Sequence, residues 1–414
     1  MIMRRIQIVL LVVLFLQGLN AQQQNLDYFL KQGLQNSPLL KDYQNRLRSA
    51  QIDSLRLKAT LGLQINATSV NSYAPVIRGW GYDEVKTDIA NVNVLAGITK
   101  EIIGNDNLRN KYQALHLQNQ STSIEGILSE KDLKRSIISQ YILAYGDQQQ
   151  HVLNAEVLGV LRQEEQMVKE LTEKGVYKQT EYLSLLVNLR QQEILTAQSG
   201  IQSKTDLELL NAMCGIYDTV CIRLPDPDIT VNTPAGPRNT LFYRQFETDS
   251  LKLVNADRQI NFEYRPKLSV YADGGYLSSM SFLPGKNFGI SAGLSLTMPI
   301  YDGGQRKMQH DQIAISEETR TDYRNFFTNQ YRQQIDMLTR QLAYHVPLSR
   351  QCAEQMVYAQ TLIDANRLLL STGDISVTDY LLSVSNYLNA KNLLIENTLT
   401  KFRIINEINY WSQK

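Results

Sequence analysis

The side chains that could ligate a metal or act as nucleophiles are scattered along this 414-residue sequence. No histidine lies in an HExxH motif or near a CxxC motif, as zinc sites require. No nucleophilic residue occurs with a base in a known catalytic motif. With 42 basic against 41 acidic residues, the chain offers no electrostatic case for nucleic acid. The sequence therefore predicts no enzyme, bound metal or cofactor. The four histidines are His116, His151, His310 and His345.

One glycine-rich segment, Asp302-Gly303-Gly304, resembles a phosphate-binding loop in composition. Such loops need a GxGxxG pattern or a Lys-Ser/Thr pair after the glycines, and neither is present. The residues before it alternate like a strand, and the residues after it are polar with helical character. We therefore predict a strand-to-helix turn here.

The N-terminus indicates export from the cytoplasm. A basic start precedes a short apolar core, Ile8–Leu16, and small or polar residues lead to Ala21, which predicts a signal peptide over residues 1–21. No later run of about 18 apolar residues predicts a membrane-spanning helix. In an oxidising compartment Cys214 and Cys221 could form a small disulfide, or both could stay buried thiols.

Four segments show the period-two alternation of strands that expose one apolar face. In the last of them, Phe288, Ile290 and Leu294 alternate with Gly289 and Ser291. This pattern fits a lipid-facing wall around a wet lumen, and it also fits the edge of a soluble sandwich. The segments are Leu61–Thr68, Asn91–Thr99, Lys267–Tyr276 and Asn287–Ile300.

Long helices dominate the rest of the chain. The predicted helix Asn107–Glu173 would measure roughly 100 Å at 1.5 Å per residue, a length that suits a coiled coil or helical tube. Apolar residues seven apart favour coiled-coil packing in the helices that follow the glycine turns. The other predicted helices are Asn25–Thr60, broken at Ser37-Pro38, Thr180–Met213, Arg244–Tyr264, Gln305–Ser371 and Ser376 to the C-terminus.

The second half of the sequence repeats the first. A shift of 198 positions maps Gly175 onto Gly373, and the same shift maps Tyr182 onto Tyr380. Each half then reads as helix, two strands, a very long helix, a tight turn and a further helix. We predict a first repeat at 22–214, a linker at 215–238 and a second repeat at 239–414.

Three motifs together resemble the TolC-like outer-membrane efflux-protein family over nearly the whole mature chain. They are PxLxV at Pro266–Val270, PIYDGGQRK at Pro299–Lys307 and GxxSxxDYL at Gly373–Leu381; Lys100–Asn105 departs from the family's P-x-(F/Y)-D-G-G form. The resemblance implies a mainly α fold with membrane β structure: a homotrimer whose 12-stranded outer-membrane barrel, four strands per chain, continues into a periplasmic α-helical tunnel. It implies an exit duct of a tripartite efflux pump or type I secretion system in a Gram-negative outer membrane, extending into the periplasm.

The resemblance also implies partners and candidate site residues. The duct would work with a periplasmic adaptor protein and an inner-membrane transporter of RND or ABC type, and outer-membrane lipid would surround the strands. The two glycine turns would form the periplasmic tip that meets the adaptor, although the glycines could simply cap helices. The predicted tip contacts are Gly175, Val176, Tyr177, Gly373, Asp374, Ile375 and Ser376.

Asp379 matches an acidic position at the family's tunnel constriction, and Glu181 is its mate in the first repeat. Three symmetry-related carboxylates near one axis would favour cations. A second acidic position of the family is Leu382 here. The alternative is a capping box, because Ser376 and Asp379 have that spacing. Both interpretations stay open at this point.

Six aromatic residues flank the predicted strands near their loops, as in an interfacial girdle. They are Tyr73, Trp80, Tyr82, Tyr276, Phe282 and Phe288. The rival to a channel is a periplasmic or surface coiled-coil scaffold whose strands form a small soluble sheet. The sequence does not name a cargo, whether drug, metal ion or secreted protein.

Overall fold

The structure, a computed structural model, describes residues 24–81, 89–217, 222–280 and 284–412. The predicted signal peptide, Tyr82, Cys221 and Phe282 lie outside these ranges. Within them no helix is both long enough and apolar enough to span a membrane. The helices and strands are α2 (Leu26–Asn36), α3 (Pro38–Thr60), β1 (Gln64–Ala74), β2 (Ile89–Ile102), α4 (Asn105–Glu173), α5 (Gln179–Met213), η2 (Pro237–Asn239), α6 (Leu241–Glu263), β3 (Lys267–Ser278), η3 (Pro284–Lys286), β4 (Phe288–Thr297), α7 (Gln305–Thr372) and α8 (Val377–Trp411).

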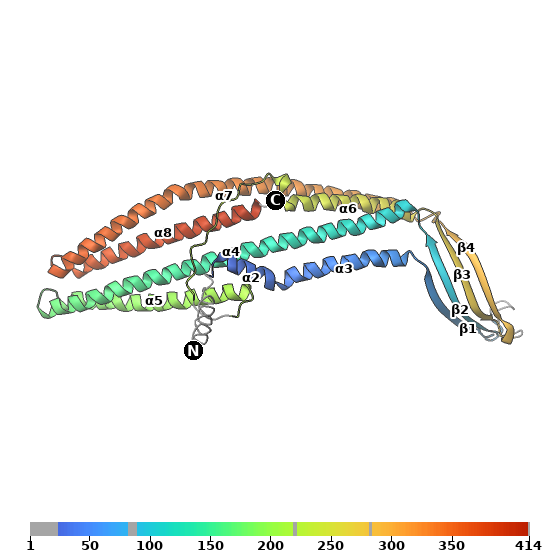
Figure 1. The fold of residues 1–414 in the computed structure, drawn as a ribbon, viewed down its shortest axis with the longest axis horizontal. Coiled ribbons are helices and arrows are strands. Elements are labelled where there is room, and N and C mark those ends of the chain that lie inside the picture. Colours follow the sequence, from blue (N-terminus) through green and yellow to red (C-terminus); the bar gives the residue numbers. More distant parts are fainter. Residues whose placement is uncertain (1–23, 82–88, 218–221, 281–283, 413–414) are drawn as a thin grey trace, which may run out of the picture. The chain divides into compact units, whose positions relative to one another are not determined.

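The element order confirms the duplicated pattern: α3-β1-β2-α4-α5 is followed by α6-β3-β4-α7-α8 (Figure 1). The chain forms two compact units. The first comprises residues 1–41, 127–241 and 328–414, and the second comprises 42–126 and 242–327. Each unit contains segments from both halves of the sequence, so neither half makes its contacts alone. The predicted repeat boundaries at 215–238 stay a prediction.

The second unit contains a four-stranded antiparallel sheet in the order β1-β2-β3-β4. Cross-strand partners point to the same face of a sheet, so the register shows which side chains share a side. Leu268 lies opposite Leu296, Val270 opposite Leu294, and Tyr276 opposite Phe288. The Tyr276 and Phe288 rings pack edge to face with centroids 5.2 Å apart. The predicted alternation of β3 and β4 therefore becomes one apolar face.

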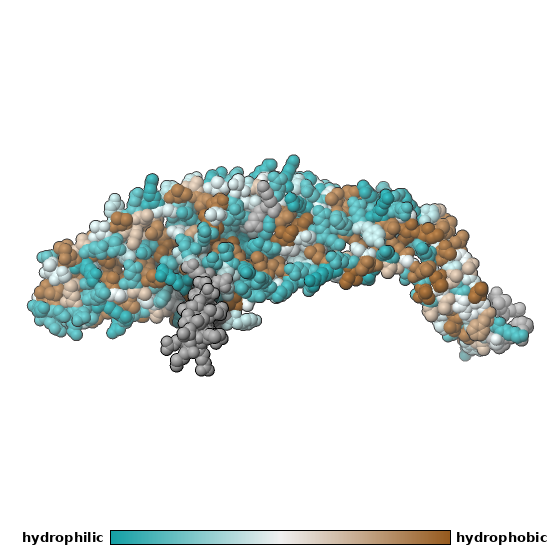
Figure 2. All heavy atoms as spheres, in the orientation of Figure 1, coloured by the Kyte–Doolittle hydropathy of each residue, from teal (hydrophilic) through white to brown (hydrophobic). Residues whose placement is uncertain are grey.

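That apolar face continues onto the other strands. Val94 is paired with Tyr276, Ile98 with Ala272, and Ile98 also with Ile65 of β1. Most side chains on it are exposed in the single chain, and Ile290 is 94% exposed, whereas Leu268 and Tyr276 are half-buried. Figure 2 shows hydrophobic residues gathered over the sheet. The opposite face is mostly polar or small, although Val70, Leu95, Tyr271 and Leu277 also lie on it. Its polar residues include Gln64, Asn66, Asn93, Thr99, Ser269, Asp273, Ser291 and Ser295.

Boundaries of all four predicted strands were wrong by one to six residues. The first strand runs on to Ala74 rather than Thr68, the second spans Ile89–Ile102, and the third runs on to Ser278. The first strand begins at Gln64 rather than Leu61, because the Leu61 amide still donates to the Leu57 carbonyl, 3.2 Å away, and so completes α3. The fourth strand ends at Thr297 rather than Ile300. Its last partner is Lys267, and Pro266, which precedes Lys267, has no amide to donate.

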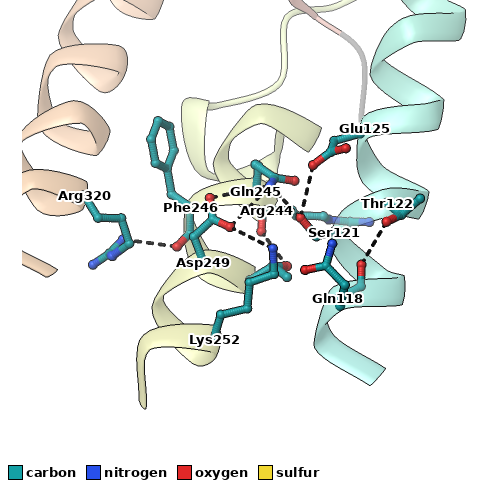
Figure 3. Close-up of polar contacts among 11 residues, drawn as sticks. Gln118, Ser121, Thr122, Glu125, Arg244, Gln245, Phe246, Asp249, Lys252 and Arg320 are labelled. Carbon is teal, nitrogen blue, oxygen red and sulfur yellow. Dashed lines mark hydrogen bonds and ion pairs between the residues drawn. The ribbon is translucent and has the colours of Figure 1, made fainter. Parts of the chain in front are cut away.

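Polar contacts link the helices of the second unit. In Figure 3, α6 lies between α4 and α7; its Gln245 donates to the buried Ser121 of α4 at 3.0 Å, and Arg320 of α7 donates to the Phe246 carbonyl at 3.2 Å. Elsewhere Asn110 of α4 and Asn255 of α6, both buried, exchange side-chain hydrogen bonds. Such bonds fix the register of the helices. If one helix slid along another, these buried polar groups would lose their hydrogen-bond partners.

The first unit is held by apolar packing among its helices. The largest cluster joins α4, α5, α7 and α8 and includes the fully buried Leu185, Leu370 and Tyr380. Gly146 lies within α4, where a Cβ atom would come 2.5 Å from Leu399 of α8. Glycine therefore permits the close approach of these two helices. Pro347 lies inside α7 without ending it.

Candidate functional site

The helix pairs α4–α5 and α7–α8 are each joined by a tight turn built on a left-handed glycine. Gly175 has φ 77° and Gly373 has φ 81°, a conformation that other residues adopt at a cost. In the first turn the Val176 amide donates to Leu171 O at 2.9 Å and the Gly175 amide to Thr172 O at 3.0 Å, a Schellman motif. The second turn repeats both bonds, from Asp374 to Leu369 at 3.0 Å and from Gly373 to Leu370 at 3.2 Å.

The structure brings the two turns together. The Tyr177 hydroxyl donates to the Leu370 carbonyl at 2.8 Å and to the Ile375 carbonyl at 3.0 Å. A Cβ atom on Gly373 would lie 2.6 Å from Val176 Cγ1, so the first turn also packs against the second. The two glycine turns, which the sequence predicts to form one tip, therefore pack against each other.

The seven predicted tip residues differ in what they present to solvent. Gly175, Val176 and Asp374 are exposed, with Val176 50% exposed, whereas Gly373, Ile375 and Ser376 are half-buried. Tyr177 is only 6% exposed. Its side chain holds the two turns together, so a partner would touch the neighbours of Tyr177 rather than its ring.

One of the two bonds of the capping box predicted for Ser376 and Asp379 is present. The amide of Asp379 donates to Ser376 Oγ at 3.1 Å, and that hydroxyl donates to the Asp379 carboxylate at 2.7 Å. Glu181 caps its own helix in a related way, since its carboxylate accepts from the Lys178 amide at 3.1 Å. Asp379 is also exposed, so its charge remains available beyond the cap.

An ion pair between a buried glutamate and an exposed arginine near the tip was missed by the sequence reasoning. Glu164 of α4 is 2% exposed, and Arg367 of α7 approaches its carboxylate to 2.6 Å. Burial raises the pKa of Glu164, and the Arg367 charge opposes that rise. The neighbouring Tyr380 is fully buried and its hydroxyl has no hydrogen-bond partner among the described residues. The two charges come from positions some 200 residues apart, so no local motif could have revealed them.

A second site that the sequence reasoning missed is a pair of touching carboxyl groups, Asp147 of α4 and Asp206 of α5. Asp206 is 3% exposed and accepts from Gln202 Nε2 at 2.6 Å. Burial, then the hydrogen bond and charge of Asp206, raise the pKa of Asp147 to about 7. At Asp206 burial favours a higher pKa. Hydrogen bonds from Asp147, Gln202 and Gln140 outweigh burial, so the pKa of Asp206 is lowered. The pair therefore shares one proton near neutral pH.

The predicted strand-to-helix turn lies between the end of β4 and the start of α7. Gly303 and Gly304 are both left-handed, with φ 67° and 84°. The Asp302 carboxylate accepts from the Gly304 amide at 2.8 Å and from the Arg306 amide at 2.7 Å, which caps the first turn of α7. A hydrogen bond from the Tyr264 hydroxyl and these amide bonds lower the pKa of Asp302.

Comparison with solved structures decides the fold. VceC, an outer membrane protein of *Vibrio cholerae*, superposes with a TM-score of 0.75 at 13% identity, over 94% of this chain and 96% of that one. The outer-membrane channel OprN gives 0.76 at 12% identity, over 93% and 89%. The open state of the *Neisseria gonorrhoeae* MtrE outer membrane channel gives 0.73 at 12% identity, over 93% and 88%.

This chain has the fold of the TolC-like outer-membrane channels. The match covers nearly the full length of these structures, so it includes the strands, the strand-to-helix turns and both helical hairpins. The fold predicted from the three sequence motifs is confirmed. No protein-family model matches the sequence, and no curated protein matches it either.

In the described part of this TolC-like chain, the polar side chains do not gather into a metal centre. The described residues contain no group of three or more His, Cys, Asp or Glu side chains that could hold an ion. The histidines instead pair with helix neighbours, such as His310 with Asp257 and His345 with Asn397. Cys214 is buried, and burial raises its pKa to about 11; its predicted partner Cys221 lies outside the described residues, so the disulfide stays untested.

Proposed function

We propose that this protein is a passive trimeric exit duct in the outer membrane of a Gram-negative bacterium, reaching into the periplasm. The observation that carries the proposal is the largely apolar face of the four-stranded sheet, most of it exposed, with a mostly polar opposite face. Lipid would cover the apolar face, and hydrated solutes would pass along the polar one. The likeness to outer-membrane channels supports the same assignment.

The trimer follows from the sheet's two free edges. Within the described sheet β1 and β4 each pair with only one strand, and four strands are too few to enclose an interior. An unpaired backbone edge in lipid costs several kcal/mol per group, so each chain must pair its β1 edge with β4 of a neighbour. Three copies give twelve strands, which leave a lumen.

The duct would belong to a tripartite efflux pump or a type I secretion system. We infer that the tip formed by the Gly175 and Gly373 turns meets a periplasmic adaptor protein, through Val176, Asp374, Ile375 and Ser376. An inner-membrane transporter of RND or ABC type would supply the cargo, so the channel itself would carry out no catalysis. Asp379, exposed at the start of α8, is proposed to line the constriction.

Cell fractionation and conductance measurements test this function. The protein should be extracted from outer membranes with detergent, migrate as a heat-modifiable trimer and form discrete conducting pores in planar lipid bilayers. A fully soluble product that gives no conductance would refute the channel and support the coiled-coil scaffold.

A further inference from the structure

A cluster of arginine and aromatic side chains lies where the sheet meets the helices in the second unit. It surrounds a shallow cavity of about 470 Å³. The end of α6, the segment leading into β3 and the first turn of α7 all contribute to it. The lining residues are Arg258, Asn261, Phe262, Tyr264, Arg265 and Arg306.

Two of the three guanidinium groups are held in place by contacts that do not neutralise them. Arg306 donates to Asn261 Oδ1 at 2.7 Å and lies over the Tyr264 ring at 5.5 Å, and Arg265 lies over the Phe262 ring at 4.7 Å. None of the three forms an ion pair within the described residues. Stacking on an aromatic ring fixes the orientation of a planar guanidinium group and leaves its N–H groups free to bind an anion.

The nearby carboxylates already have other partners. Asp302 accepts from two amides at the start of α7 and from the Tyr264 hydroxyl. Asp257 pairs with His310 at 2.5 Å, and Glu263 accepts from Gln259 at 3.4 Å. These carboxylates keep their charge, but none of them lines the cavity, whose lining carries three guanidinium groups and no acidic side chain.

The cavity's position along the strands points to a lipid headgroup. The apolar row of β4 continues past the strand through Met298 and Ile300, which is 91% exposed, and Asp302 follows at once. From Phe288 to Ile300 is 12 residues, roughly 40 Å of extended chain or about 30 Å after a tilt of some 40°. That matches the hydrocarbon thickness of a bilayer, so the arginines lie at headgroup level.

We propose that this cavity binds the phosphate of an anionic phospholipid in the leaflet on the helical side of the membrane. Paired guanidinium groups match the geometry of phosphate oxygens, and Phe262 and Tyr264 suit the interface between headgroups and acyl chains. The proposal rests on the outer-membrane location proposed above. Its consequence is that each copy of the chain carries one bound lipid where the strands end.

Lipid retention on the purified full-length protein, measured by native mass spectrometry and titration, tests the proposal. Dioleoyl phosphatidylglycerol is the probe, dioleoylglycerol is the matched lipid without phosphate, and glycerol phosphate is the headgroup without acyl chains. We expect the first to bind and the other two to bind at least tenfold more weakly, because the site needs both charge and an adjoining apolar face. Equal binding of dioleoylglycerol, or glycerol phosphate binding as tightly as the lipid, would overturn it.

Variants separate the site from general charge effects. The double variant Arg265→Gln/Arg306→Gln should bind the lipid about tenfold more weakly, on the order of 1.4 kcal/mol. Arg332→Gln/Arg340→Gln removes two exposed arginines elsewhere on α7 and should bind like the wild type. Arg265→Lys/Arg306→Lys keeps the charge but loses the fork, and should be intermediate. Equal lipid binding by all four proteins would refute the site.

The same preparations distinguish this inference from the channel assignment. Trimer migration of every variant shows that it is folded and assembled. A wild-type protein that conducts but binds the lipid no better than dioleoylglycerol overturns the lipid site alone. A wild-type protein that is soluble and does not conduct overturns the channel, and the lipid site with it.

Discussion

The shared proton between Asp147 and Asp206 should make the protein's stability depend on pH in the reverse of the usual direction. In the unfolded chain Asp147 would titrate near its ordinary pKa of 3.8, whereas the folded protein holds its proton up to about pH 7. Between these values the native state binds the extra proton, so stability falls as pH rises from about 4 to about 7. Below both values the pair imposes no penalty.

The magnitude is bounded by the size of the shift. About three pH units at 1.36 kcal/mol each give an upper limit of about 4 kcal/mol. Asp147 is half-exposed, so solvent screens the repulsion, and the lowered pKa of Asp206 offsets part of the penalty. We therefore expect a penalty of about 1–2 kcal/mol at pH 8. Glu396 adds to it and Arg403 relieves it, both from α8.

Asp147→Asn tests this reasoning, because the amide can donate to Asp206 at every pH. The variant should unfold at the same temperature as the wild type at pH 4 and about 1–2 °C higher at pH 8. Apparent midpoints of the detergent-solubilised protein, followed by circular dichroism at one fixed scan rate, measure the difference. Asp311→Asn, an exposed carboxyl on α7, is the control. If Asp147→Asn and the wild type changed in parallel with pH, the two carboxyls would not share a proton.

Two further substitutions test the sheet and the tip. Leu294→Arg, on the apolar face, should lower the stability of the membrane-inserted protein by about 2–4 kcal/mol and block trimer assembly. Ser295→Arg, on the opposite face, should assemble and lower the single-channel conductance. If the protein tolerated both substitutions equally, the assignment of the faces would be contradicted. Gly373→Ala should cost about 1–2 kcal/mol, because φ is 81° and the new Cβ would meet Val176. Its control, Gly159→Ala inside α4, meets nothing within 4 Å and should raise the thermal midpoint slightly.

Local sequence patterns were sufficient to predict the backbone. The alternation of Ile290 and Leu294 with Ser291 and Ser295 depends only on the two-residue period of a strand, and the structure places the two sets on opposite faces. Gly175 and Gly373 end long helices because only glycine adopts the left-handed turn cheaply. The ends of the strands were harder to predict, because a strand ends where the neighbouring strand no longer offers residues for backbone pairing.

Contacts between distant segments could not be predicted from these patterns. Glu164 reads as one more charged residue on a long polar helix until Arg367, from the other half of the chain, is placed beside it. The same holds for Asp147, whose neighbour Asp206 lies on the next helix. A period shows which face of a helix is apolar, but not which buried polar residue will face which partner.

The duplication repeats the backbone more faithfully than the chemistry. The two tip turns share the same pair of hydrogen bonds, yet Val176 of the first corresponds to Asp374 of the second. Likewise Glu164 corresponds to Leu362, so only one of the two related positions carries a buried charge. In a trimer such differences would alternate around the ring, with an apolar and an acidic turn in each copy. An adaptor that docks on this tip would therefore meet two kinds of groove, and charge reversal at Asp374 should weaken only one of them.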